Sequence, residues 1–575
     1  MKVFNKIFKN PLFWILLLAL TLRLYKLGEF PYGFHVDEVK VAWNALSILK
    51  TGHDDQNKIL GLYYNSFGDF RPSGIFYIAV PSIAIFGRSE FATRFPVALF
   101  GALTILPIYF LIEIFDKSKK LKLKSIGTGH IGAFLMAISP WSIDLSRATN
   151  EVVISTFFAI TSLYFFIKLI KFKRKKYGIF SIVSLLVSYL FYHAIRFIGP
   201  LFFISTFCFY LKEIKKKEIK RLSLICIIFS IFLTAYFGIS QNGLARLDQT
   251  SIFNNVDTIY QIQRIQLEDT TKNLFTLSFD NKIISYLGTF TTEFGKYFSE
   301  SFLAGASGRP YRFATPGVGV ITYVELILLI IGIVQVIRGK KNLLPLILLI
   351  LAPLPAAVTS EDAPNLSRAF MMLPFLIILE AQGLEFIFLL SRKFKKQIVI
   401  GSLLLLVLNF SYFTYMYFDH SVSHLPYLKD YSGDSPTYRD VGAKELSLEL
   451  DSLKGKYSKV IITDFPDSVY PWYAFFTNKD PSDFNKTYST TTMERDYENI
   501  IFSQEKCPSD NGLLTYRKQN ILMIDSWECG YQNQINDGSP LKKVGQIKRP
   551  DGSIVYTLLE RDWTKPLIVN GIRYE

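Results

Sequence analysis

Long apolar segments constrain the fold of this chain more than any other feature of its sequence. About eleven of them have the length, roughly 17 to 25 residues in most cases, that carries a helix across a bilayer. Backbone polar groups inside a bilayer must be hydrogen-bonded within the protein, and an α-helix satisfies them all. We therefore predict a mainly α fold, a polytopic transmembrane helical bundle, in which segment 73–89 adds a partial or re-entrant span. The full spans lie near 11–28, 90–115, 127–143, 150–170, 178–194, 196–211, 222–239, 318–337, 342–358, 366–390 and 397–418.

The 64 Lys and Arg residues outnumber the 48 Asp and Glu residues, and the resulting net charge of +16 raises the question of nucleic-acid binding. Their distribution argues against it, because they gather in short runs between the apolar segments. Such runs favour the cytoplasmic side of a membrane. We therefore predict a multi-pass protein of the plasma (inner) membrane that binds no nucleic acid and retains its first span as an anchor. The runs are MKVFNKIFK, DKSKKLKLK, KFKRKK, KEIKKKEIKR, RGKK and SRKFKK.

The acidic and irregular segments fall on the opposite, extracytoplasmic side of this topology, so we expect any chemistry to take place there. They comprise the outer loops 29–89 and 240–317, the turns 139–151, 191–197 and 359–368, and the chain beyond residue 418.

Acids and bases gather between Pro31 and Pro72, a segment that lies between two apolar ones. From Asp37 onward the apolar residues recur at i, i+3, i+4 spacing, and Gly52 is a C-terminal stop signal. This pattern predicts a short amphipathic helix on the membrane surface, with Asp37 and Glu38 in its first turn. The apolar positions are Val39, Ala42, Trp43, Leu46 and Leu49.

Two explanations of the Asp37 and Glu38 pair remain open, a role in chemistry and helix capping. Acidic residues in the first turn of any helix satisfy free backbone N–H groups and complement the helix dipole.

Other polar residues of this region have structural explanations. For Arg94, an ion pair or an anchor at the end of a span is favoured. His35 and His53 have no partners at metal-ligand spacing, so we do not expect zinc.

The chain from about Asp419 to Glu575 has a different composition, with polar residues, many Tyr and short β-like runs. Together they predict a soluble extracytoplasmic α/β domain, 419–575, that follows the transmembrane domain, 1–418. Cys507 and Cys529 lie in it, and a disulfide between them is open in such a compartment. The predicted strands are KVIITDF (459–465), NILMIDSW (520–527) and SIVYTLLE (553–560).

A series of motifs carries a resemblance over roughly residues 1–418. They resemble the membrane glycosyltransferases of the C superfamily, in particular the family 39 branch of protein O-mannosyltransferases and aminoarabinose transferases. In order, they are HVDE, KTGHD, FGDFRPSGIFYIAVPSIAIFGRSEFATRFPVAL, PWSIDLSRATNEV, YHAIRF, RPYRFATPGVGV and LAPLPAAVTSEDAPNLSRAFMMLP.

The resemblance implies transfer of a sugar from a polyprenyl-phosphate-linked donor to an acceptor at the outer face of the membrane. Asp37 matches the residue proposed as catalytic base in such enzymes, and Glu38 accompanies it. Arg71 stands where the aminoarabinose branch has Lys before a Pro pair, although here Ser follows the first Pro. Arg147 matches the Ser-Arg of the second outer loop, and Glu151 would be its acidic partner.

The chemistry fits these residue types. A carboxylate can accept the proton of the acceptor, and cations stabilise the leaving phosphate. Arg suits phosphate because its planar guanidinium donates two parallel hydrogen bonds. The candidates for phosphate binding are Arg71, Arg147, Arg196, Arg312 and Arg368, and those for acceptor or sugar binding are Asp69, Glu151, Glu361 and Asp362.

Structural roles stay open for several of these residues. Arg196 and Arg368 suit span ends as well as they suit phosphate, and capping explains Glu361 and Asp362 as well as acceptor binding does.

Two other classes of function share some of these features. A transporter or flippase of a lipid-linked or anionic substrate would place paired ionisable residues near mid-membrane, where Glu325 and Glu380 are the clearest. A scaffold or sugar-binding receptor would use the outer domain. The clustering of acids and Arg at outer span ends favours the enzyme. We predict no cofactor and leave a divalent metal open, and we expect membrane lipids, a polyprenyl-phosphate sugar and a protein, glycan or lipid acceptor as partners.

Overall fold

The computed structural model divides into two compact units, which we treat separately. The bundle unit comprises Met1–Leu27, Leu62–Ile75 and Phe95–Tyr417, and the sheet unit comprises Gly28–Gly61, Phe76–Arg94 and Phe418–Glu575. The structure describes residues 8–66, 69–115, 126–239, 251–254, 256–268, 273–305, 307–339, 342–390, 395–420, 442–463, 469–487, 495–527, 529, 539–548, 552–569 and 572–574.

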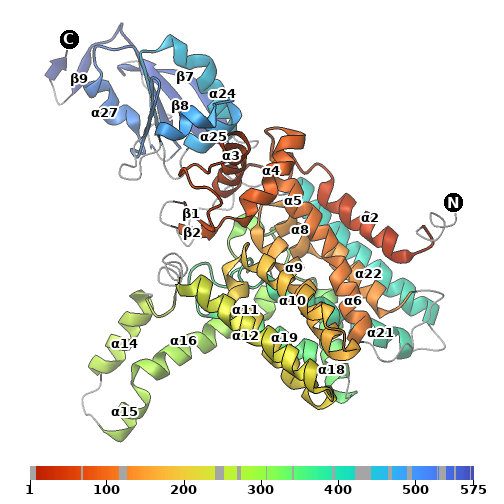
Figure 1. The fold of residues 1–575 in the computed structure, drawn as a ribbon. Helices are drawn as coiled ribbons and strands as arrows, with labels where there is room; N and C mark the ends of the chain where they lie inside the picture. The colour runs from red at the N-terminus through yellow and green to blue at the C-terminus, as the bar shows by residue number, and fades with distance from the viewer. Residues whose placement is uncertain are drawn as a thin grey trace. The chain divides into compact units, whose positions relative to one another are not determined.

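Helices dominate the chain (Figure 1). The mainly α class and the multi-pass membrane character are thus confirmed. Within the described residues, six helices are long and apolar enough to cross a membrane: Glu90–Phe115, Glu151–Phe172, His193–Glu213, Lys217–Gly238, Phe370–Leu389 and Ile400–His420. Shorter apolar helices are Pro11–Leu24, Gly74–Phe86, Thr128–Ile138, Lys176–Tyr189 and Leu344–Ala357.

Proline residues divide two of the predicted spans. The span predicted at 127–143 consists of two helices, α7 (Thr128–Ile138) and α8 (Pro140–Arg147). Pro140 opens α8 because its missing N–H costs nothing at the first helical position. The span predicted at 342–358 is likewise divided at Pro353, into α19 (Leu344–Leu351) and α20 (Leu354–Ala357). Segment 73–89, predicted as a partial span, contains the short helix α4 (Gly74–Phe86).

Small residues bring two helices of the bundle unit into close contact. α18 (Tyr323–Arg338) packs on α21 (Leu373–Leu390) where Gly332 faces the backbone of the partner helix. A Cβ atom on Gly332 would lie 2.0 Å from the carbonyl oxygen of Leu379, and one on Gly383 would lie 2.0 Å from that of Leu328. Membrane helices use such small residues because close backbone approach supplies the packing energy.

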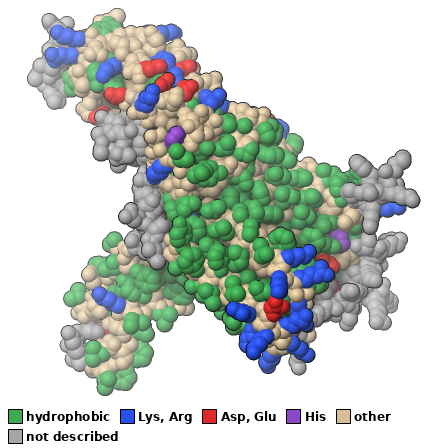
Figure 2. Space-filling view, in the orientation of Figure 1, with side chains coloured by type: hydrophobic (Ala, Val, Ile, Leu, Met, Phe, Trp, Pro, Cys, Tyr) green, Lys and Arg blue, Asp and Glu red, His purple; other side chains and the backbone are tan. Residues whose placement is uncertain are grey.

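Basic side chains gather at one end of the bundle unit, beside a broad hydrophobic surface (Figure 2). Two turns supply them: residues 173–175 join α9 (Glu151–Phe172) to α10 (Lys176–Tyr189), and residues 214–216 join α11 (His193–Tyr210) and its short continuation to α12 (Lys217–Ile239). The predicted basic run at 116–124 and residues 391–394 lie outside the described residues. Arg147, at the end of α8, and Arg196, in the first turn of α11, lie at the other ends of these helices.

A six-stranded mixed sheet forms the centre of the sheet unit. Its strand order is β4-β5-β3-β6-β8-β7, with β3 parallel to β5 and β6 and the other pairs antiparallel. The three runs predicted as strands lie in β3, β6 and β8, although residues 464 and 465 are outside the described residues. The strands are β3 (Lys459–Thr463), β4 (Arg495–Tyr497), β5 (Ile500–Ser503), β6 (Ile521–Ser526), β7 (Leu541–Lys548) and β8 (Ile554–Arg561).

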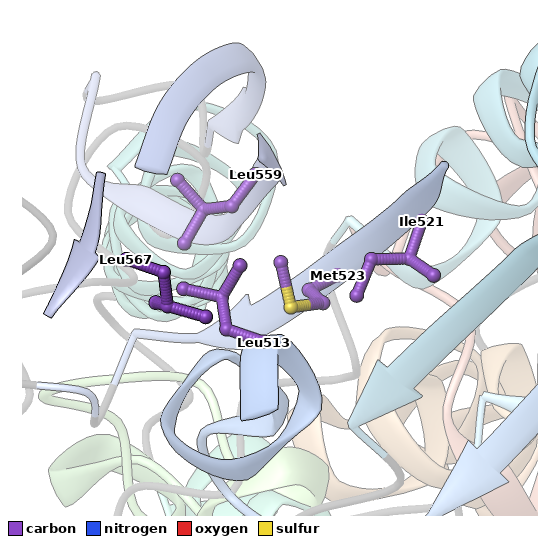
Figure 3. Packing of buried hydrophobic residues seen from close by; sticks show 5 residues of the cluster. All are labelled: Leu513, Ile521, Met523, Leu559 and Leu567. Carbon is purple, nitrogen blue, oxygen red and sulfur yellow. The ribbon is translucent and has the colours of Figure 1, made fainter. Parts of the chain in front are cut away.

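Leu513 of α27 (Pro508–Thr515) packs against strand residues in a buried cluster (Figure 3). Cys507 and Cys529 form a disulfide with Cα atoms 5.7 Å apart, which ties the start of α27 to the chain after β6. Two further helices of this unit are α24 (Ala443–Leu453) and α25 (Tyr470–Phe476). The clustered residues are Leu513, Ile521, Met523, Leu559 and Leu567.

Candidate functional site

The predicted amphipathic helix is present as α3 (Val36–Thr51), in the sheet unit. His35 caps its start, because the ring Nδ1 accepts a hydrogen bond from Asp37 N at 3.1 Å. In return, Glu38 Oε2 accepts one from His35 N at 3.2 Å, which completes a capping box. The helix ends at Gly52, whose φ of 79° suits glycine.

The apolar face of α3 is covered by protein, whereas the sequence predicted that it would lie on the membrane surface. Trp43 Nε1 donates to Asn485 Oδ1 at 3.0 Å, and Trp472 Nε1 donates to Phe34 O at 3.0 Å. The helix therefore packs against α25 and α26 (Pro481–Phe484). Sequence reasoning missed this because the partners lie more than 400 residues away, in a segment treated as a separate domain.

Glu38 forms a buried ion pair with Arg94. Arg94 Nε lies 2.9 Å from Glu38 Oε1 and Arg94 Nη2 lies 3.1 Å from Glu38 Oε2, and the two side chains are 3% or less exposed. The structural explanation favoured for Arg94 therefore holds. Both carboxylate oxygens of Glu38 are occupied by Arg94 and the helix cap.

Asp37 has a different environment from its neighbour. Its side chain is 18% exposed, and Oδ2 lies 3.5 Å from His35 Nδ1. The same nitrogen accepts the backbone N–H of Asp37 as part of the helix cap. Asp37 therefore lies at the partly exposed start of α3, beside the capping histidine.

Arg147, in the bundle unit, is 0% exposed and binds backbone oxygens. Its Nη1 donates to Leu22 O at 2.8 Å and its Nη2 to Tyr25 O at 2.7 Å, while Nε donates to the hydroxyl of Tyr417 at 3.2 Å. These contacts hold the end of α2 (Pro11–Leu24). Arg147 thus fixes the end of the first apolar helix.

Arg196 also binds protein groups. It is 6% exposed, donates twice to Tyr189 O at 3.1 and 2.7 Å, and donates to the hydroxyl of Tyr63. Tyr63 begins the hairpin of β1 (Tyr63–Ser66) and β2 (Asp69–Pro72), in which Arg71 pairs with Tyr64. Arg196 therefore anchors the strand opposite Arg71, which is itself only half-buried.

Two loops of the bundle unit, 307–316 and 359–368, pair through their backbones. Arg309 N donates to Pro364 O at 2.9 Å, and Leu366 N donates to Arg309 O at 2.7 Å. The pairing brings Arg312 near Asp362 and Arg368, so candidates more than 40 residues apart in sequence form one cluster. Arg309 belongs to it as well; sequence reasoning missed this residue although it lies in the same RPYRF motif as Arg312.

The acids of this cluster have unequal surroundings. Glu361 holds Arg368, with Oε2 accepting from Nη2 at 2.5 Å. Burial raises the pKa of the Asp362 carboxyl, although the charges of Arg312, Arg368 and Arg309 oppose the rise. The cluster thus places three guanidinium groups near two acids, one of which, Glu361, pairs with Arg368.

A third loop of the bundle unit joins the cluster through side chains. Thr315 Oγ1 donates to Asp144 Oδ1 at 2.8 Å, and Asn150 Nδ2 donates to Ser367 Oγ at 2.7 Å. Glu151 follows as the first residue of α9 and is half-buried. The side chain of Asp69 lies outside the described residues.

Comparison with known proteins supports the family-level prediction. The model of the family described as dolichyl-phosphate-mannose-protein mannosyltransferase matches residues 71–237, a range that contains Arg71, Arg147, Glu151 and Arg196. The predicted resemblance to protein O-mannosyltransferases is thus confirmed over this range. A comparison with curated proteins found no match.

Two solved glycosyltransferase structures are similar to this chain. ArnT from Cupriavidus metallidurans in the apo state is 11% identical to this chain, with a TM-score of 0.50. The match covers 96% of this chain and 98% of the ArnT chain. The archaeal oligosaccharyltransferase AglB from Archaeoglobus fulgidus, in complex with an inhibitory peptide and a dolichol-phosphate, is 12% identical with a TM-score of 0.45. The match covers 82% of this chain but only 63% of AglB. The likeness to ArnT shows a shared fold.

The two acids that a transporter would place near mid-membrane have different surroundings. Glu325 caps α18, since Thr322 N donates to its Oε2 at 2.7 Å. Glu380, on α21, is 0% exposed, and neither of its carboxylate oxygens has a hydrogen-bond partner among the described residues. Within the described residues, no three His, Cys, Asp or Glu side chains come together as a metal site would require.

Proposed function

We propose that this protein transfers a sugar from a polyprenyl-phosphate-linked donor to an acceptor at the outer face of the membrane, with Asp37 as the general base. The observation that carries this choice of base is the division of roles in the Asp37 and Glu38 pair. Arg94 and the helix cap occupy the Glu38 carboxylate, whereas the Asp37 side chain is 18% exposed. A base needs access to its proton donor, so Asp37 is the better candidate.

The proposed reaction is a displacement at the anomeric carbon of the sugar. A hydroxyl or amine of the acceptor attacks this carbon, and the bond from the carbon to the phosphate oxygen breaks. The proton of the nucleophile passes to the Asp37 carboxylate, and the electron pair leaves with the polyprenyl phosphate. Arginine side chains stabilise the negative charge that collects on this phosphate.

The five candidate arginines divide by burial. Arg71 and Arg312 are half-buried and are our proposed phosphate ligands. Arg147 and Arg196 are 6% or less exposed, and their guanidinium groups bind backbone oxygens, so we propose that they position the loops. Arg368 is held by Glu361 and shares this role.

The proposed acceptor or sugar ligands are acids of the same loops. Asp362, surrounded by arginines, is the best supported of them. Asp69, Glu151 and Glu361 remain proposals from the sequence, and the acceptor is a protein, a glycan or a lipid. The family description, which names a dolichyl-phosphate sugar, supports the class of donor.

The division of the arginines is testable with purified protein and polyprenyl phosphates that carry a radiolabelled sugar. Arg312→Gln and Arg71→Gln should each raise the KM for the donor about tenfold or more, since a charged hydrogen bond to phosphate contributes roughly 1.5 to 3 kcal/mol. Arg174→Gln is the matched control, because Arg174 is an exposed residue of a basic turn. Unchanged KM values in both variants would contradict the assignment, and movement of intact donor without cleavage would indicate a flippase.

A further inference from the structure

Three helices that the proposed chemistry does not use form an arm of the bundle unit. They are α14 (Val256–Glu268), α15 (Leu274–Phe279) and α16 (Lys282–Lys296), and the arm lies between α12 and α18 in the chain. Figure 1 shows α14 and α16 extending away from the bundle, with α15 at the far end, crosswise to α11 and α12. α14 and α16 contact each other along the arm.

The base of the arm is attached to the loops of the arginine cluster. Ile252 N donates to Val358 O at 3.0 Å, and the hydroxyl of Tyr297 accepts from Asn365 N at 3.1 Å. Tyr286 of α16 donates to Phe253 O at 3.1 Å, which joins the two sides of the arm. The arm therefore starts at the end of the bundle unit that carries these loops, and the basic turns lie at the other end.

Large apolar side chains of the arm are exposed. At its far end, Leu274 is 81% exposed, Phe275 is 74% exposed and Leu277 is 67% exposed. Soluble monomeric proteins rarely expose apolar patches of more than a few hundred Å². The other exposed apolar residues are Val256, Ile259, Tyr260, Ile265, Leu267, Phe279, Ile283, Ile284 and Leu287.

The arm is amphipathic, and asparagine side chains cap the starts of α15 and α16. In α16, Ile283 and Leu287 recur at i, i+4 on one face, while Thr292 is exposed on the opposite side. Asn273 and Asn281 cap α15 and α16 by accepting backbone N–H bonds. The segment from Asn273 to Phe279 contains no charged residue.

We propose that this arm lies on the lipid bilayer, with its apolar side chains inserted at the boundary of the acyl chains. The two helices that flank the arm in the chain also expose large apolar side chains. Ile228 of α12 is 65% exposed and Ile327 of α18 is 58% exposed, as residues that face lipid are expected to be. An amphipathic helix crosswise to the spans is oriented as interfacial helices are. Tyr260 and Tyr286 suit this depth, because tyrosine rings favour the membrane boundary.

Spin labels on single cysteines test the proposal in the full-length protein reconstituted into phosphatidylcholine vesicles. Phe275→Cys in α15 and Leu287→Cys in α16 place the label on exposed apolar positions, and Thr292→Cys is the matched control on the polar face of α16. The parent protein carries Cys208→Ala and Cys226→Ala, because these two free cysteines would also be labelled. Cys507 and Cys529 form a disulfide and do not react with the label. Collisions with oxygen, which concentrates in lipid, are compared with collisions with a water-soluble nickel complex.

We expect labels at 275 and 287 to collide several-fold more with oxygen than with nickel, and the label at 292 to show the reverse. Preferential collision with nickel at 275 and 287 would place the apolar face in water and overturn the proposal. Low collision with both reagents would mean that protein covers this face, and would overturn it as well. Thermal unfolding midpoints equal to that of the parent establish that each labelled variant is folded.

Discussion

Arg94 Nε donates a hydrogen bond to Glu38 Oε1 at 2.9 Å, and the side chains of both residues are almost fully buried. The pair joins the first turn of α3 to the start of α5 (Glu90–Leu103). Adjacent carboxylates thus have separate environments, because Glu38 is fixed inside the protein and Asp37 is partly exposed. An Asp-Glu pair that looks uniform in sequence contains one structural acid and one candidate base.

Glu38→Gln should destabilise the protein by about 3 kcal/mol, because removing one partner leaves the Arg94 charge buried and uncompensated. Asp37→Asn should cost less than about 1 kcal/mol, since a first-turn acid contributes mainly through the helix dipole. Thermal unfolding of the purified variants in detergent, followed by tryptophan fluorescence, measures both. Equal midpoints for the two variants would refute the division of roles.

Gly383→Ala should destabilise the bundle by about 3 kcal/mol or more, because the added Cβ would lie 2.0 Å from the carbonyl oxygen of Leu328. Gly401→Ala is the control: that glycine also lies in an apolar helix, α22 (Lys395–Tyr415), but has no atom within 4 Å of an added Cβ. Folded yield and unfolding midpoint of the two variants are the measurements. A Gly383→Ala protein as stable as Gly401→Ala would show that α18 and α21 do not pack this closely.

Asp525 makes the stability of the sheet unit depend on pH. Burial raises the pKa of its carboxyl to about 6, although hydrogen bonds from Ser509 lower it. The folded-state pKa is above the unfolded one, about 3.9, so the protonated acid stabilises the fold at low pH. This contribution is lost as pH rises through about 6, and amounts to about 3 kcal/mol for a difference of roughly two pKa units.

Asp525→Asn removes this titration while retaining the size of the side chain. We expect the stability of the wild type relative to the variant to fall between pH 4 and pH 7, measured by thermal unfolding at several pH values. Because both proteins share all other titrating groups, the difference isolates Asp525. Parallel stability profiles for the two proteins would contradict the predicted titration.

Local patterns in the sequence predicted the elements of the fold better than their partners. The spacing of apolar residues after Asp37 predicted α3, and the stop at Gly52 was correct. The same pattern could not show that Trp472 and Asn485 cover the helix, since contacts over such sequence distances leave no local periodicity. For this reason, the pattern predicted that α3 lies on the membrane surface.

The arginines illustrate the same limit. Sequence alone treated Arg147 and Arg312 as equivalent cations, because charge and position at a span end are all that a pattern records. Burial distinguishes them: Arg147 binds the oxygens of Leu22 and Tyr25, while Arg312 lies half-buried in a loop cluster. Only the pairing of the two loops through Arg309 brings this cluster together.

The most direct test of the account compares wild type and Asp37→Asn with a panel of polyprenyl phosphates carrying radiolabelled sugars. Wild type should release the sugar of at least one donor from its lipid in the presence of membrane extract as acceptor source. Asp37→Asn should remain folded, by its unfolding midpoint, and lose at least about a hundredfold of this activity, as removal of a general base typically does. Release of sugar by folded Asp37→Asn at the wild-type rate would contradict the central claim.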